Sequence, residues 1–394
     1  MFKFDFDIDD AEEFDELAGV KASEPIQATA GDEAPVLEPF SELPIHQLLD
    51  AFPQLISYSP LSIPLTSPRK ATTLVRRDLF DARFQLIAEG AGDAPEEPPN
   101  PKDEISEAGR YPESDRKALG FLDAPSDLVP GVYEGGLKTW ECSLDLVEYL
   151  DGLKDGPEYN SFTGKKILDV GCGTGVPSMY VLRELLECLE PNEKGATKTE
   201  IHLQDYNASV LQLMTLPNML LTWYPYRYTT NDSETAPTID LNVPGEVIIT
   251  PQLKSAFLES LASLNITLRF FSGSWDTFSP IETAGKSGYD VLLTSETIYR
   301  TESLGPLINL MHSACTGKAP PTLESLVSDL NISKSTPSES RPSLCLVAAK
   351  VLYFGVGGGV SDFLQAIEGH KGRVETVLER RAGVGRKIMR VYWP

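Results

Sequence analysis

Three glycines at alternate positions make Gly171–Gly175 the stretch of this chain with the clearest chemical meaning. The apolar run Ile167–Val170, which contains Asp169, precedes it, and a helix-like segment begins at Val176. Strand, tight turn and helix N-terminus together predict a nucleotide-cofactor site, because glycine lets a ligand approach the backbone closely. The dinucleotide fingerprint G-x-G-x-x-G needs glycine at position 176, so the valine there argues against a dinucleotide.

Polar and aromatic residues follow the next two expected strands. Asp205 ends one of them, between Gln204 and Tyr206, and an ionised carboxylate there accepts hydrogen bonds from both hydroxyls of a ribose. Trp275 stands just beyond the other and offers an aromatic ring at the same edge of the sheet. The carboxyl ends of strands in a doubly wound sheet meet at one edge, so these residues converge. Each also has a structural reading, since acids are common in post-strand turns and Trp275 could belong to the core.

A carboxylate and a phenol, Glu296 and Tyr299, follow a further expected strand. Glu296 is placed to orient a nucleophilic nitrogen or to take its proton, and Tyr299 to shape the pocket. Alternatively, Glu296 caps the helix that begins near Ser303. Upstream, the glycine-rich segment 131–143 precedes an amphipathic helix, and it either closes over a cofactor or serves as a connector.

The elements that must position these residues alternate between strands and helices, which predicts a doubly wound α/β domain over residues 128–394. The strands expected in the parallel part of the sheet are 166–170, 200–205, 266–271, 289–294 and 343–350. Two more, 373–378 and 387–393, predict an antiparallel hairpin at the sheet edge. The stretches 224–245 and 317–342 lack periodicity and are interpreted as surface insertions.

Residues 1–127 form a different region, which is acidic and rich in proline. We expect its first 40 or so residues to be disordered, a short helix within 42–55, and linkers over 59–70 and 90–116. The stretch 72–88 is more apolar and is expected to pack on the main domain. The region holds 27 acidic and 11 basic residues and contributes −16 to a formal net charge of −24. This charge disfavours nucleic-acid backbones, and it either attracts basic proteins or simply keeps the chain soluble.

Cysteine usage and hydropathy exclude several classes of protein. The five scattered cysteines include no C-x-x-C pair, and the four histidines are dispersed, so we expect neither a disulfide framework nor a metal site. No apolar run approaches the roughly 18 residues that suggest a membrane span. The N-terminus lacks the basic region and apolar core of a signal peptide. We therefore expect a protein of the cytoplasm and nucleus without a membrane partner.

The pattern Asp-x-Gly-x-Gly-x-Gly over 169–175 resembles the first motif of class I S-adenosylmethionine-dependent methyltransferases, whose mostly parallel seven-stranded sheet also closes with an antiparallel hairpin. Four motifs narrow the resemblance to the histidine protein methyltransferases: Val132–Gly136, Trp140–Cys142, Gln204–Asn207 and Thr294–Tyr299. Glu296, where most of the wider group has aspartate, points to this subfamily. The resemblance covers residues from about 128 to the C-terminus, and 76–81 looks like an N-terminal element of fungal members.

The resemblance implies S-adenosylmethionine as the cofactor, no metal, and Glu296 and Tyr299 as catalytic residues. Together with the glycine loop it predicts a set of cofactor-binding residues: Thr139, Trp140, Glu141, Cys142, Ser143, Asp169, Gly171, Gly173, Gly175, Gln204, Asp205, Tyr206, Gly273, Ser274, Trp275 and Ser295. The family methylates one histidine of a large-subunit ribosomal protein in eukaryotes. The resemblance therefore implies a basic protein substrate, and we expect a monomeric enzyme that does not bind nucleic acid directly.

In-line transfer to an imidazole nitrogen is the expected reaction, because histidine has a reference pKa of about 6.5 and is mostly a neutral nucleophile at pH 7. One alternative is a lysine methyltransferase of the same structural group, which needs more help with deprotonation since lysine has a reference pKa of about 10.4. Another is a non-catalytic chaperone whose acidic N-terminal region holds a ribosomal protein. A small-molecule methyltransferase is less favoured. Intact Asp169, Asp205 and Glu296 favour an active enzyme.

Overall fold

The computed structural model describes residues 38–88, 128–129, 133–156, 161–193, 195, 197–229, 240–318, 343–353, 357–381 and 383–394. The expected disorder of the first 37 residues, the expected linker 90–116 and almost all of the expected insertion 317–342 lie outside these stretches. Residues 117–127, which lie between the expected linker and position 128, are also outside these stretches.

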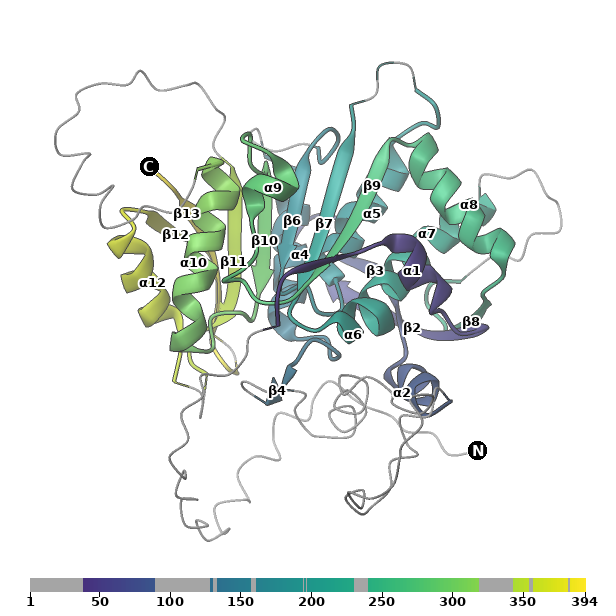
Figure 1. The fold of residues 1–394 in the computed structure, drawn as a ribbon, viewed down its shortest axis with the longest axis horizontal. Helices are drawn as coiled ribbons and strands as arrows, with labels where there is room; N and C mark the ends of the chain where they lie inside the picture. The colour runs from purple at the N-terminus through teal and green to yellow at the C-terminus, as the bar shows by residue number, and fades with distance from the viewer. Residues whose placement is uncertain are drawn as a thin grey trace, which may run out of the picture.

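A mixed sheet forms the centre of the molecule, in the order β1-β9-β7-β6-β10-β11-β13-β12 (Figure 1). The parallel strands are β9 (Ile266–Ser272), β7 (Thr199–Asp205), β6 (Lys166–Val170), β10 (Val291–Ser295) and β11 (Leu344–Lys350). The antiparallel hairpin is β12 (Arg373–Arg380) with β13 (Arg386–Tyr392), and it pairs with β11 through β13. The predicted doubly wound sheet with its closing hairpin is thus confirmed.

An eighth strand that the sequence analysis did not expect lies at the opposite edge. β1 (Ser41–Leu43) pairs antiparallel with β9, and Arg269 of β9 forms a two-contact ion pair with Glu42 of β1, at 2.7 and 2.8 Å. Three residues are too few for a visible period-2 pattern, which explains the omission. The short helix expected within 42–55 is confirmed as α1 (Ile45–Asp50).

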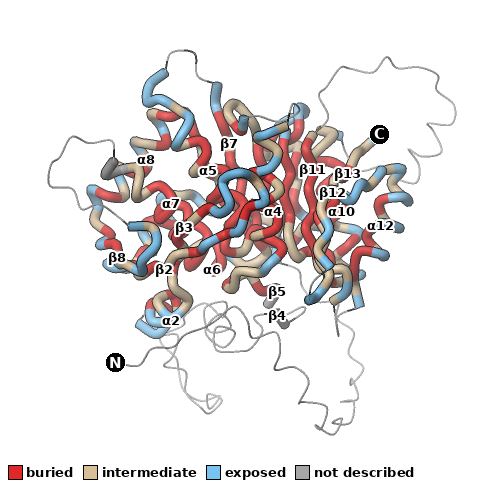
Figure 2. The backbone as a smooth tube through the Cα atoms, turned by 180° about the vertical axis from the view of Figure 1, so that it is seen from behind, coloured by how far each residue is buried: buried red, intermediate tan, exposed pale blue. Residues whose placement is uncertain are grey.

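Helices cover both faces of the sheet, and neighbouring residues of a strand point into opposite cores. Ile167 of β6 and Leu293 of β10 belong to the core under α4 (Glu141–Leu153), α5 (Val176–Cys188), α7 (Leu216–Thr229) and α8 (Pro251–Ser263). Leu168 and Leu292 belong to the core under α9 (Pro280–Ala284), α10 (Thr301–Thr316) and α12 (Val360–Gly369). Figure 2 shows buried residues gathered along the central strands. No helix in the described parts of the chain is long and apolar enough to cross a membrane.

A second, three-stranded sheet contradicts one expectation. β2 (Leu55–Pro64) pairs with β3 (Ala71–Arg77) and with β8 (Gly245–Ile248), so 59–70 is part of a hairpin rather than a linker. Of the expected insertion 224–245, residues 224–229 belong to helix α7, Gly245 begins β8, and 230–239 lie outside the described residues. The prolines within β2 are the reason that the sequence analysis interpreted 59–70 as a linker. β8 pairs only with residues 55–58, so Pro60 and Pro64 lie where that edge of β2 is open and no N–H is needed.

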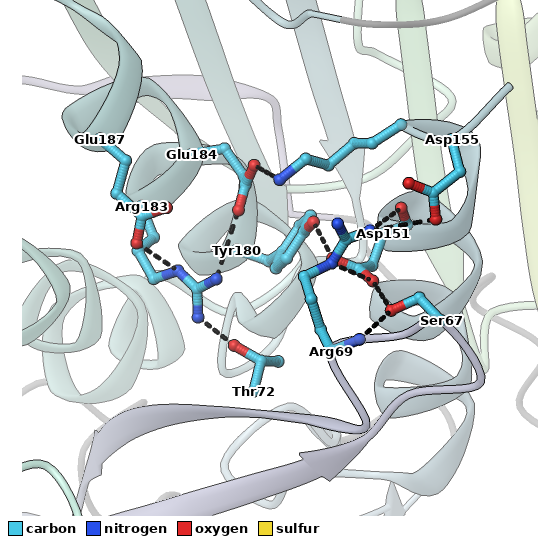
Figure 3. A network of polar contacts seen from close by, with 10 residues as sticks. Ser67, Arg69, Thr72, Asp151, Asp155, Tyr180, Arg183, Glu184 and Glu187 are labelled. Atoms are coloured by element: carbon cyan, nitrogen blue, oxygen red, sulfur yellow. Dashed lines mark hydrogen bonds and ion pairs between the residues drawn. The ribbon is translucent and has the colours of Figure 1, made fainter.

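The hairpin of β2 and β3 belongs to the main domain, because polar contacts join its turn to α4 and α5 (Figure 3). Asp151 of α4 accepts hydrogen bonds from Ser67 Oγ at 2.7 Å, Arg69 Nε at 2.9 Å and Tyr180 OH at 2.8 Å. Burial opposes its ionisation, but these donors hold the pKa of Asp151 below its usual value. The expected packing of 72–88 on the domain is also confirmed: β3 continues into α2 (Leu79–Ala88), whose Ala82 and Leu86 pack near η3 (Leu211–Thr215).

Candidate functional site

A cavity of about 450 Å³ opens where the parallel strands end. Its walls come from the residues that directly follow β6, β7, β9, β10 and β11, and from the segment that precedes α4. Of the predicted site residues, it is lined by Trp140, Ser143, Gly171, Gly173, Asp205, Tyr206, Ser274, Trp275, Ser295, Glu296 and Tyr299. The remaining predicted residues lie beside or beneath this lining: Thr139, Glu141, Cys142, Asp169, Gly175, Gln204 and Gly273.

The glycine loop joins β6 to α5 and requires glycine at all three positions. Gly171, Gly173 and Gly175 have φ values of 60°, 52° and 74°, in the left-handed region that other residues avoid. A Cβ on Gly171 would lie 2.6 Å from Cγ2 of Thr297, so no side chain fits there. Gly175 is the N-cap of α5 and takes part through the turn rather than through the cavity wall. The loop thus exposes backbone without side chains at the cavity wall, which allows a nucleoside cofactor to approach the backbone closely.

Gln204 joins three walls of the cavity from beneath. Its side-chain oxygen accepts the N–H of Gly171 at 3.2 Å and the indole N–H of Trp275 at 2.8 Å. Its side-chain nitrogen donates to the carbonyl oxygen of Gly273 at 2.9 Å. The residue is fully buried, so it positions the glycine loop and the post-β9 turn without facing the cavity itself.

Two carboxylates lie next to the glycine loop. Asp205, at the end of β7, accepts the N–H of Gly173 at 2.9 Å and the N–H of Asn207 at 3.1 Å, which makes it a fixed acceptor at the cavity for hydroxyl groups. Asp169 is buried below the loop and accepts a hydrogen bond from Ser178 Oγ at 2.7 Å. Burial raises the pKa of Asp169 to about 7 against this hydrogen bond, and the charge of Asp205 adds to the rise.

The N-terminal segment covers the turn after β9, which the sequence analysis did not foresee. Gly273 has a φ of 103°, and a Cβ there would lie 2.4 Å from the carbonyl oxygen of Pro39. Ser274 N–H donates to the carbonyl oxygen of Glu38 at 2.9 Å, and Phe40 packs edge-on against Phe278. Residues from the acidic region therefore hold the turn that carries Ser274 and Trp275, although none of that region's described residues lines the cavity.

The segment before α4 closes one side of the cavity. Thr139 Oγ1 lies 3.1 Å from Thr174 Oγ1 of the glycine loop, so it ties the two segments together. Trp140 and Ser143 line the cavity, whereas Cys142 is buried behind them and burial raises the pKa of its thiol. Of the predicted cofactor contacts in 139–143, only Trp140 and Ser143 line the cavity, because successive residues at the start of a helix point in different directions.

Glu296 also lines the cavity. It directly follows β10 and has a φ of 59°, a left-handed conformation that costs a non-glycine residue about 1–2 kcal/mol. Its N–H donates to the carbonyl oxygen of Ala348 in β11 at 2.9 Å. The hydroxyl of Tyr353 donates to Oε2 of Glu296 at 2.7 Å. Strain held in place by a neighbouring strand is typical of a functional position.

Lys350, the last residue of β11, and Tyr353, three residues beyond it, line the cavity and are candidate site residues that the sequence analysis missed. The ammonium of Lys350 lies 4.7 Å from the ring centre of Trp140, 3.3 Å from Glu141 and 3.8 Å from Oε1 of Glu296. The strand-end rule that identified Asp205 and Glu296 applies equally to β11, so the signal was present. The other missed lining residues are Gly135, Gly136, Lys138, Cys172, Thr174, Asp276, Thr297, Arg300, Glu302, Ser303 and Pro306.

Curated relatives of this chain share one name. Histidine protein methyltransferase 1 of Schizosaccharomyces pombe is 32% identical over 355 residues, which cover 88% of this chain and 82% of that protein. Histidine protein methyltransferase 1 of Saccharomyces cerevisiae is 32% identical over 305 residues, which cover 75% and 69%. The Bos taurus homologue is 35% identical over 62% of this chain and 51% of its own length. No family model matches the chain.

Solved structures with a similar arrangement include magnesium protoporphyrin IX methyltransferase from Synechocystis with bound S-adenosylmethionine. It has a TM-score of 0.32 and 10% identity, and the match covers 73% of this chain and 86% of that one. A TM-score this low supports no inference about function. The sequence relatives do: identity above 30% across most of both proteins shows the family and supports methylation of histidine in proteins. The chain therefore belongs to the histidine protein methyltransferase 1 family, as an enzyme that depends on S-adenosylmethionine.

Proposed function

We propose that this enzyme methylates a ring nitrogen of one histidine in a basic protein, specifically a large-subunit ribosomal protein, in the cytoplasm and nucleus. The observation that carries the proposal is one cavity lined both by the glycine loop with Asp205 and Trp275, which we call the cofactor end, and by the carboxylate of Glu296, which we call the reacting end. The formal net charge of −24 supports a basic partner, because it favours encounter with positively charged proteins.

The residues at the cofactor end fit S-adenosylmethionine. Gly171 and Gly173 present backbone without side chains, Asp205 offers a carboxylate to ribose hydroxyls, and Trp275 offers an aromatic edge. When bound, S-adenosylmethionine supplies the methyl group: the sulfur–methyl bond breaks as the nitrogen–methyl bond forms, and the electron pair of the broken bond stays on sulfur. The chain holds the nitrogen in line, and such alignment alone is worth about 7–11 kcal/mol in favourable intramolecular reactions.

Histidine suits the reacting end better than lysine does. An imidazole with a pKa of about 6.5 is mostly neutral at pH 7 and presents one nitrogen with a free lone pair, so the enzyme has only to orient the ring. The ring becomes a cation when it gains a methyl group. The Glu296 carboxylate stabilises that charge and accepts the proton of the other ring nitrogen, which returns the product to neutrality.

The test is the chemical identity of the methylated residue. Purified enzyme is incubated with S-adenosylmethionine labelled on the methyl group and with lysate from cells that lack the enzyme. The labelled protein is then identified and hydrolysed to amino acids. We expect methylhistidine in a large-subunit ribosomal protein. Methyl-lysine would move the enzyme to the alternative substrate class, and methylhistidine in a non-ribosomal protein would refute the proposed partner alone.

Two variants make the result specific to the cavity. Glu296→Gln should lose labelling while it still binds S-adenosylmethionine. Glu259→Gln, an exposed glutamate of α8, serves as the matched control and should label normally. Cofactor binding without any labelling by the wild-type enzyme would favour a non-catalytic chaperone.

A further inference from the structure

The two carboxylate oxygens of Glu296 have different surroundings. Oε2 accepts the hydroxyl of Tyr353 at 2.7 Å. Oε1 is buried and accepts no hydrogen bond of normal geometry from the described residues, although Glu296 lines the cavity. The Cys142 thiol lies near this carboxylate, whose charge and hydrogen bonding add to the effect of burial in raising the pKa of the thiol. Its nearest cation, the ammonium of Lys350, lies 3.8 Å away, beyond hydrogen-bond distance. A buried acceptor without a donor is uncommon in folded proteins, so Oε1 is available to a donor that enters the cavity.

Lys350 does not turn toward this oxygen because other groups hold it. Its ammonium forms an ion pair with Glu141 at 3.3 Å and lies over the ring of Trp140 at 4.7 Å. Both partners belong to the segment that begins α4, so the lysine keeps that segment against the end of β11. Its ammonium remains 3.8 Å from Oε1 of Glu296.

The hydroxyl of Tyr353 has a donor role toward Glu296. It donates a hydrogen bond to Oε2 of Glu296 and accepts one from the backbone N–H of Lys350 at 3.2 Å. Burial and the negative charge of Glu296 raise the pKa of Tyr353 well above its usual range, so the phenol stays protonated and remains a donor. Its ring lies edge-on to that of Tyr299, with centroids 6.3 Å apart.

We infer that Tyr353 is a positioning residue that acts through Glu296: it occupies Oε2 and thereby presents Oε1 to the N–H of the substrate ring. Only the tautomer with its proton toward Oε1 is then bound productively, and the opposite nitrogen carries the lone pair that attacks. This inference rests on the proposed function, because it needs a substrate with one donor and one acceptor nitrogen. A lysine side chain has no such pair of nitrogens.

The backbone supports the same assignment. Glu296 is held in its left-handed conformation by the hydrogen bond to Ala348, and Ala348 lies in the strand that leads to Tyr353. The N–H of Gly358, farther along the same connection, donates to the carbonyl oxygen of Tyr299 at 3.0 Å. β11 and the chain that follows it therefore bond to the chain that follows β10 at two separate points, Ala348 and Gly358, which fixes the carboxylate and the phenol relative to each other.

The experiment is a double-mutant cycle on the full chain. The variants Tyr353→Phe, Glu296→Gln and the double variant are assayed for kcat and KM with a histidine-containing substrate protein and saturating cofactor. We expect kcat to fall about 10-fold in Tyr353→Phe and about 100-fold in Glu296→Gln. The double variant should be no slower than Glu296→Gln alone, because the phenol has nothing left to position. KM should change less than kcat in each variant.

Binding and stability are measured beside activity. Calorimetry should give the same affinity for S-adenosylmethionine in all variants, because none of the changes touches the glycine loop. Tyr289→Phe is the matched control: Tyr289 is buried and hydrogen-bonded to His202 at 2.8 Å, but it lies outside the cavity lining, so its kcat should equal that of the wild type. If Tyr353→Phe proves unstable, comparison of the double variant with Glu296→Gln still tests the inference. In both of these variants the neutral glutamine amide leaves no buried charge unpaired.

Two results would overturn the inference. Wild-type kcat in Tyr353→Phe would show that the phenol positions nothing. Effects that multiply in the double variant would show that Tyr353 acts on the substrate directly rather than through Glu296. If the wild-type enzyme labels lysine and not histidine, the proposed function fails first and the role of Oε1 fails with it. Failure of the inference alone leaves methylhistidine production by the wild type intact.

Discussion

At the cofactor end of the cavity the polar groups pair with one another, since Gln204 alone bonds Gly171, Gly273 and Trp275. At the reacting end, Glu296 combines a left-handed backbone with a buried oxygen that accepts no hydrogen bond of normal geometry from the described residues. The polar groups of Gln204 have partners within the protein, whereas Oε1 of Glu296 is left, on our proposal, for a donor of the substrate. Interactions formed only with the reacting molecule are the kind that raise kcat, and a rigid binding end secures affinity.

Gly171→Ala should have the largest effect on cofactor affinity, because it changes the shape of the glycine loop at the cofactor end. A left-handed alanine costs about 1–2 kcal/mol. Its Cβ, 2.6 Å from Cγ2 of Thr297, adds overpacking of about 1–3 kcal/mol. We expect calorimetry to show affinity for S-adenosylmethionine at least about 100-fold weaker, since 1.4 kcal/mol is tenfold. Gly152→Ala in α4, where the new Cβ meets nothing within 4 Å, should bind normally. Similar affinities in the two variants would show that the loop is not rigid.

Asp169 makes the stability of the cofactor end depend on pH. Its pKa is about 7 in the folded protein, while an unfolded aspartate has about 3.9, so the folded state holds the extra proton between these values. Stability from this group is therefore present below about pH 4 and lost as pH rises toward 7, by up to about 4 kcal/mol. Urea unfolding at pH 5 and pH 7.5 should show a smaller loss in Asp169→Asn than in the wild type. The exposed Asp50→Asn is the control; equal losses in Asp169→Asn and wild type would contradict the assignment.

Asp205→Asn and Glu296→Gln should separate the two ends. Hydrogen bonds to a charged group are worth about 1.5–3 kcal/mol, so Asp205→Asn should weaken cofactor binding by roughly 10- to 100-fold, with kcat nearly unchanged at saturation. Glu296→Gln should do the reverse. Calorimetry and steady-state kinetics on both variants measure the contrast. Parallel changes in affinity and kcat in either variant would mean that the ends do not work separately.

Trp275→Phe should give the smallest effect and refine the same contrast. Phenylalanine keeps an aromatic edge at the cavity but removes the indole N–H that Gln204 accepts at 2.8 Å. A hydrogen bond of this kind contributes about 1 kcal/mol, so we expect cofactor affinity to fall by about 5-fold at unchanged kcat. A change in kcat with unaltered affinity would place Trp275 at the reacting end.

The central sheet and the cofactor end could be predicted from the sequence because their signals are local. Apolar runs mark the strands, and the glycine loop carries its spacing within a few residues, so Asp169 and Gly171 are recognisable without tertiary contacts. Asp205 and Glu296 follow from the position of strand ends in a doubly wound sheet. The structure adds that Gln204 and Asp169 act from beneath the lining, a distinction that burial alone decides.

The reacting end and the second sheet required contacts between distant segments. Tyr353 is an ordinary tyrosine until β11 brings it to Glu296, 57 positions earlier. In β2, Pro60 and Pro64 follow the rule for linkers, yet the buried side chains of Ile56 and Ile63 join the main core and outweigh it. In β2, tertiary packing of these side chains thus outweighs the low strand propensity of the prolines, which lie where one edge of the strand is open.

The segment Glu38–Leu43 gives the acidic region a fixed point of attachment. The N–H of Ser274, which lines the cavity, donates to the backbone of Glu38, and β1 pairs with β9, so the described part of the acidic region begins next to a cavity wall. Residues 1–37 precede this point of attachment in the chain. That stretch holds 11 acidic and 2 basic residues. If this stretch captures the basic substrate protein proposed above, the captured protein stays next to the enzyme at a local concentration on the order of millimolar, whatever its concentration in solution. Removal of residues 1–37 would then raise KM for the protein substrate and leave cofactor affinity unchanged.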